Sequence, residues 1–101
     1  MITANECYEK FKDKIKADNT KINMLFICIS AEISGMLRER NIKTNKGAAM
    51  VVLELNNIWN EVADMYEKEF GECPIAKDGF MEAWALRKPE LQEYLFEEKA
   101  E

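Results

Sequence analysis

Carboxylate and amide side chains recur along residues 54–64 at the spacing of one helical face. Glu54, Asn57, Glu61 and Asp64 are three, four and three residues apart, which places them on one polar stripe. Glu61 and Asp64 lie one turn apart, and such a pair can hold Mg²⁺ together with the phosphates of a substrate. The alternative, which we favour, is the ordinary solvent-facing side of an amphipathic helix.

The chain contains no histidine, and this limits its chemistry. Ser-His-Asp and Cys-His nucleophiles and histidine-containing zinc sites are excluded. Cys7, Cys28 and Cys73 are far apart and lack a C-x-x-C spacing, so we expect reduced thiols. A Gly-rich phosphate loop, a Rossmann fingerprint and an EF-hand loop are also missing from the sequence. An enzyme built on this chain would use carboxylates or lysines.

The stretch Trp59–Tyr66, W-N-E-V-A-D-M-Y, resembles the second metal-binding helix of the all-α nucleotide pyrophosphohydrolases, the MazG-like enzymes. That family carries Glu-x-x-Glu on one helix and Glu-x-x-Asp on a later one. Residues 31–37 lie upstream at a compatible distance, but Gly35 stands where the second glutamate would be. The resemblance covers these two short stretches and implies Mg²⁺-dependent hydrolysis of nucleoside triphosphates. The metal ligands that it implies are Glu32, Glu61 and Asp64.

A basic segment precedes the predicted long helix. Residues 38–47 read R-E-R-N-I-K-T-N-K-G, a polar connection that ends in a glycine. Free amides and the dipole at a helix start favour anions, so a phosphate or a nucleic-acid backbone could dock here. The candidate anion-binding residues are Arg38, Arg40, Lys43 and Lys46. Because the pI is about 4.9, we do not expect a nucleic-acid partner and favour a solvated loop.

Large apolar side chains are numerous for 101 residues, with two Trp, five Phe, three Tyr and six Met. Core packing explains each of them singly. As a set they predict an apolar patch that a protein partner, or a second copy of the chain in a homo-oligomer, would cover. The candidate residues of this interaction surface are Trp84, Leu91, Tyr94 and Phe96.

Length and composition are those of one domain spanning residues 1–101, with 48% hydrophobic and 33% charged residues. The N-terminal sequence lacks the features of a signal peptide, and the longest apolar run, Met24–Ile29, is far shorter than the roughly 20 residues of a membrane span. We therefore expect a cytoplasmic protein without a membrane partner. The wealth of Lys, Asn and Ile suggests a bacterial or phage genome.

Charge is divided unevenly along the chain. Residues 1–50 carry nine Lys/Arg and six Asp/Glu, a net charge of +3, whereas residues 51–101 carry five and thirteen, a net charge of −8. Either the halves lie against each other and partly neutralise, or they form a bipolar surface that steers a partner. We favour neutralisation.

Hydrophobic spacing predicts an all-α fold, a small bundle of four to five helices. A capping box at Thr3–Glu6 begins the first helix, and its periodicity fails at Asp18. The run Ile22–Ile29 fits a buried strand, but the spacing over residues 22–37 is helical, so we predict a helix. Met24, Ile27 and Cys28 give this helix a second apolar face. We expect it at the centre of the bundle, packed between neighbours.

The longest helix, which we also expect to be central, is predicted at about residues 47–70, with Gly71 as its C-terminal cap. Asp78 is the expected N-cap of a short helix. Pro89 either kinks that helix or begins a new one. The chain ends in the acidic segment 97–101.

These observations predict a small acidic helical module for protein interaction or regulation, with no enzymatic activity and no cofactor. The alternative is a divergent MazG-like, metal-dependent nucleoside triphosphate pyrophosphohydrolase. The third hypothesis is an anion or nucleic-acid contact through residues 38–46.

Overall fold

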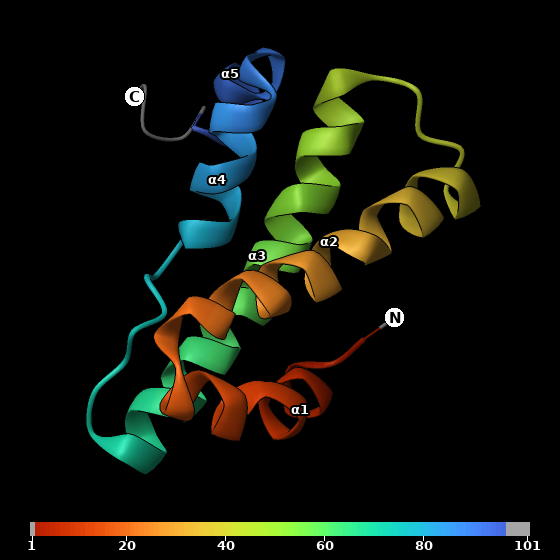
Figure 1. Ribbon diagram of the computed structural model, residues 1–101. Helices are drawn as coiled ribbons and strands as arrows, with labels where there is room; N and C mark the ends of the chain where they lie inside the picture. The colour runs from red at the N-terminus through yellow and green to blue at the C-terminus, as the bar shows by residue number, and fades with distance from the viewer. Residues whose placement is uncertain (1, 97–101) are drawn as a thin grey trace.

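The computed structural model describes residues 2–96, and within this range every regular element is helical (Figure 1). The elements in chain order are α1 (Ala4–Ala17), the 3₁₀ turn η1 (Asn19–Lys21), α2 (Ile22–Glu39), α3 (Asn45–Phe70), α4 (Gly79–Arg87), the 3₁₀ turn η2 (Pro89–Leu91) and α5 (Gln92–Leu95). The all-α prediction is confirmed, and the ambiguous segment 22–29 is helical. The acidic segment 97–101 lies outside the described residues.

Helix α1 begins at the predicted capping box and is tied to the end of α3. Thr3 Oγ1 accepts a hydrogen bond from the Glu6 backbone amide, and the Glu6 carboxylate accepts one from the Thr3 amide. The Tyr8 hydroxyl donates to Glu69 Oε1 over 2.5 Å, and Lys12 Nζ lies 3.6 Å from the same oxygen. The hydrogen bond from Tyr8, more than the charge of Lys12, lowers the pKa of Glu69.

Helix α3 is the centre of the bundle and contacts α1, α2, α4 and α5. Figure 1 shows α2 crossing in front of α3, with α1 beside one end of α3 and α4 and α5 beside the other. Thr44 Oγ1 caps α3 by accepting a hydrogen bond from the Gly47 amide, and Gly71 ends it with a left-handed φ of +78°, as predicted. The long central helix is thus confirmed and begins two residues before the predicted position 47.

Helix α2 covers one side of α3, and Met24 and Ile27 on its outer side are exposed. Its inner stripe of Leu25, Ile29, Ile33 and Met36 is buried. The expectation that residues 22–37 are packed between neighbours on both sides is wrong, because the helices of this bundle gather around α3. By length and hydropathy alone, the stretch Asn19–Glu39 could also cross a membrane, a test that core helices pass as well.

Helix α4 is held at its first turn by α3. Asp78 has the predicted N-cap position, with a φ of +61°, but its side chain does not cap α4. Its Oδ1 instead accepts hydrogen bonds of 2.9 Å from the side-chain amides of Asn56 and Asn60. Asn56 Oδ1, reaching across from α3, accepts from the Met81 backbone amide over 3.2 Å. The capping role that the sequence assigned to the Asp78 side chain therefore belongs to Asn56.

After α4 the chain leaves the helical conformation at Lys88, and Pro89 begins the turn η2, the second of the two alternatives for this proline. Leu91 and Leu95 then enter the core, and Gln92 Nε2 donates to the Ala85 carbonyl oxygen over 3.0 Å. The C-terminal turns thereby close the end of the bundle beside α3.

Replacing Asn56 by alanine should lower the free energy of unfolding by about 2 kcal/mol, because the buried Met81 amide loses its acceptor. Urea unfolding measures this loss. Asn57→Ala is the matched control, since Asn57 is exposed on the same helix, and it should stay within about 0.5 kcal/mol of the parent. Equal effects of the two variants would contradict the capping role of Asn56.

The Tyr8–Glu69 hydrogen bond should make stability depend on pH. Because the folded-state pKa of Glu69 is lowered, its contribution is complete above the ordinary glutamate pKa of about 4.3 and is lost as the pH falls through the folded-state value. Tyr8→Phe should therefore reduce stability at pH 7, and its difference from the parent should shrink below about pH 4. Urea unfolding from pH 3 to pH 7 tests this, and a difference that stays constant would contradict it.

Candidate functional site

The three carboxylates of the metal hypothesis have separate surroundings. Glu32 Oε1 accepts a hydrogen bond of 2.8 Å from the Ile2 amide, so this carboxylate ties the chain before α1 to α2. Glu61 and Asp64 are exposed on α3. Within residues 2–96, no three His, Cys, Asp or Glu side chains form a group that could hold a metal ion. The resemblance to pyrophosphohydrolases thus gains no ligand cluster from the described residues.

The basic segment that spans the end of α2 and the start of α3 is partly engaged within the protein. Arg40 binds the Glu54 carboxylate with both guanidinium nitrogens, at 2.7 and 3.1 Å. This hydrogen-bonded pair lowers the pKa of Glu54. Arg38, Lys43 and Lys46 are exposed. The Thr44 hydroxyl already accepts a hydrogen bond from the Gly47 amide in the first turn of α3. An anion at this helix start would compete with it.

The predicted interaction residues of the C-terminal part lie at the core or its edge. Leu91 is only 2% exposed, which corrects its assignment to a surface. Tyr94 and Phe96 are half-buried and pack against the core. Trp84 is half-buried too; its indole N–H donates to Ser30 Oγ over 3.2 Å, and its ring stacks on Phe26 at 6.2 Å between centroids. These side chains mainly join α4 and α5 to the bundle.

Helix α2 carries two of the exposed large apolar side chains of the bundle, whereas Met50 on α3 and Leu86 on α4 are each exposed singly. Ile27 is 65% exposed and Met24 is 40% exposed. One and two turns farther along the same stripe the helix carries only small side chains, all exposed, and a Cβ added at Gly35 would meet no atom within 4 Å. We call this stripe the α2 outer face, and it consists of Met24, Ile27, Ala31, Ser34 and Gly35.

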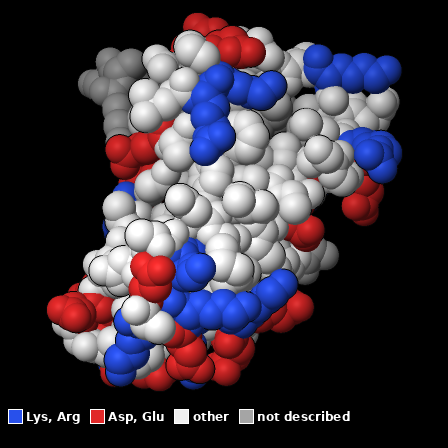
Figure 2. Space-filling view, viewed as in Figure 1, with Lys and Arg blue, Asp and Glu red and all other residues white. Residues whose placement is uncertain are grey.

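The α2 outer face carries no charge of its own but has basic neighbours. Between residues 22 and 37 the only charged residue is Glu32, which is bonded to the Ile2 amide. Lys21 and Arg38 stand at the two ends of the stripe, and both are exposed. On the side toward α4, the Arg87 guanidinium lies 4.9 Å from the centre of the Phe26 ring. Figure 2, viewed as Figure 1, shows an uncharged middle with Lys, Arg, Asp and Glu side chains around it.

The sequence contained a signal for this surface. Met24 and Ile27 fall on a second apolar face of their helix, as the spacing indicated. What the spacing could not tell is whether another element covers that face. The cavity lined by Lys16, Tyr66 and Glu72, at the ends of α1 and α3, had no sequence signal, because its residues come from distant segments.

Comparison of the chain with protein-family models, with curated proteins and with solved structures gives no match. The resemblance of Trp59–Tyr66 to a pyrophosphohydrolase helix therefore stays a resemblance of two short stretches.

Two isoleucines two positions apart test whether the α2 outer face is open. Ile29→Ala should cost about 2–4 kcal/mol of unfolding free energy, because Ile29 is fully buried. Ile27→Ala should change it by no more than about 0.5 kcal/mol, since most of that side chain already faces water. Urea unfolding of both variants gives the comparison, and a large loss for Ile27→Ala would mean that this face is covered.

Proposed function

We propose that this chain is a protein-interaction module that binds its partner across the α2 outer face. The observation that carries the proposal is the exposure of Ile27 and Met24 within residues 22–37, a segment that has one charged residue. Uncovered apolar surface bordered by polar residues is typical of protein contact sites. Neither catalysis nor a cofactor is required for this function.

The shape of the face suits another helix. Met24 and Ile27 project from one end of the stripe, whereas Ala31, Ser34 and Gly35 leave the other end low. A partner helix could place its larger side chains over the small residues and receive Ile27 between its own turns. The contact would be of the kind in which an amphipathic helix lays its apolar side on a complementary surface.

Charge favours a different protein over a second copy. A partner helix with acidic residues on both sides of its apolar stripe would pair with Lys21 and Arg38. In a symmetric dimer through this face, an antiparallel arrangement would bring Lys21 near Arg38 of the other copy, and a parallel one would bring each residue near itself. Both arrangements oppose like charges, and this disfavours self-association.

Cross-linking from the face itself tests the proposal. A photoreactive amino acid in place of Ile27 should capture one protein that carries an apolar helix with acidic flanks, and the same group in place of Met50 should not. Met50 is the matched control because it is 63% exposed on α3, outside the α2 outer face. With the captured partner purified, Ile27→Asp should weaken binding about tenfold or more, and Met50→Asp should leave it unchanged.

Three outcomes would overturn this proposal. Capture of a second copy, with a matching mass in light scattering, would make the face a homodimer contact. Binding to anionic phospholipid vesicles that Ile27→Asp abolishes, without a captured protein, would make it a membrane contact. Equal capture from positions 27 and 50 would mean that the face has no specific partner.

A further inference from the structure

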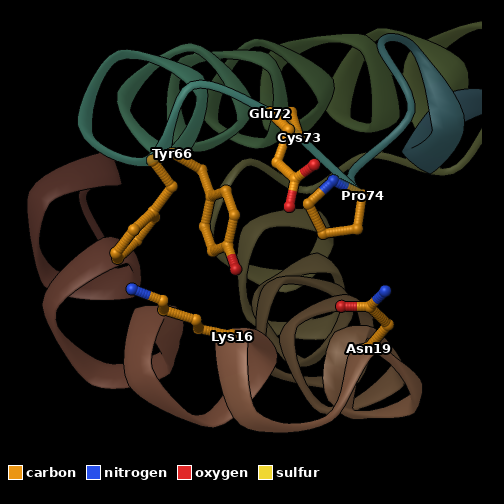
Figure 3. A pocket seen from close by; sticks show the side chains of 7 residues that line it. Lys16, Asn19, Tyr66, Glu72, Cys73 and Pro74 are labelled. Carbon is orange, nitrogen blue, oxygen red and sulfur yellow. The ribbon is translucent and has the colours of Figure 1, made fainter.

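A cavity of about 300 Å³ lies between the C-terminal end of α1 with η1 and the C-terminal end of α3 with the loop after it. Side chains from segments about 50 residues apart in sequence meet there, as Figure 3 shows. Lys16 and Asn19 come from one side, and Tyr66, Glu72 and Pro74 from the other. This volume is at the lower end of the range of small-molecule sites.

Tyr66 is the most informative residue of the cavity. It is only 3% exposed, and its ring packs against Phe70 with 4.7 Å between centroids. Its hydroxyl forms no hydrogen bond among residues 2–96 and points into the cavity (Figure 3), where it reaches solvent, because no buried side-chain N or O atom of this range lacks a partner. By contrast, the hydroxyl of Tyr8 donates a hydrogen bond to Glu69. Because this hydroxyl is open to the cavity, it can donate a hydrogen bond to a ligand bound there.

Opposite charges reach the same cavity without pairing. Lys16 Nζ lies 4.4 Å from the centre of the Phe70 ring, and Glu72 is exposed on the loop after α3. Neither side chain forms an ion pair with any residue in the described range 2–96. Figure 3 places the Lys16 ammonium and the Glu72 carboxylate on different walls, with the Tyr66 hydroxyl between them. Asn19 adds an amide that can donate or accept.

The cysteine of the cavity is engaged with the backbone. The Cys73 thiol lies within hydrogen-bond distance of the carbonyl oxygens of Ala63, at 3.3 Å, and Ile75, at 3.4 Å. Burial raises the pKa of Cys73, which keeps the thiol protonated. Burial likewise raises the pKa of Tyr66, so its hydroxyl stays a donor. The cavity is equipped for binding and not for covalent chemistry.

We propose that this cavity binds a small zwitterion of the free α-amino acid class. The carboxylate of the ligand is held by the Lys16 ammonium and by the hydrogen bond that the Tyr66 hydroxyl donates. The ammonium of the ligand is held by the Glu72 carboxylate. The site is independent of the α2 outer face, and it gives the module a place where a metabolite binds.

Amide chemical shifts of the ¹⁵N-labelled protein, titrated with individual free L-amino acids at millimolar concentration, test this proposal. At least one amino acid should produce saturable shifts centred on residues 16–19 and 66–74. Acetate and methylamine, each carrying one of the two charges, should bind at least about tenfold more weakly. Tyr66→Phe keeps the ring and removes the donor, so it should weaken binding about tenfold.

Lysines of α1 provide the control pair. Lys16→Met should abolish binding, whereas Lys14→Met should leave it unchanged, because Lys14 also sits over a ring, that of Phe11, but does not line the cavity. This pair still decides the matter if Tyr66→Phe proves unstable in urea. No saturable shift with any amino acid, acetate binding as tightly as the best amino acid, or equal binding by the two lysine variants would each overturn the proposal.

Discussion

One helix has to supply a packing surface for every other element of this bundle, and that constraint shapes the molecule. With 26 residues, α3 is roughly 39 Å long, which matches the longest dimension of 38 Å. Its C-terminal part receives α1, its N-terminal part receives α4 and α5, and α2 crosses it. The other helices pack mainly on α3. The outer side of α2 therefore keeps exposed apolar side chains.

The sequence predicted what is local. Periodicity identified all the main helices, and the capping box at Thr3 and the glycine after α3 marked helix ends, because a helix and its caps depend on residues only a few positions apart. The centre of the bundle was less accessible. Spacing shows that α2 is apolar on two sides, but not how many neighbours are available to cover them. Both the long helix 47–70 and α2 were expected to be central. Only the long helix lies at the centre of the bundle.

In the candidate sites, too, the sequence revealed the local patterns but not the contacts between distant segments. The second apolar face of Met24, Ile27 and Cys28 was expected to pack against a neighbour, but Met24 and Ile27 face outward. Asn56 and Asn60, four residues apart on a largely apolar helix, were the overlooked sign of a buried polar contact with the loop before α4. The cavity that contains Tyr66 depends on where the ends of two helices meet, and no spacing within one segment encodes that meeting.

The contact between Asn56 and the first turn of α4 also links the stability of α4 to the presence of α3. A nine-residue helix is too short to be stable by itself, and this one takes its N-terminal cap from a side chain 25 residues earlier. Helix α4 therefore depends on α3 for its stability. On a growing chain, Phe26 and Trp59 would stay in water until α4 arrives with Phe80, whose ring completes the aromatic cluster. The aromatic cluster is therefore complete only when α4 has joined α2 and α3.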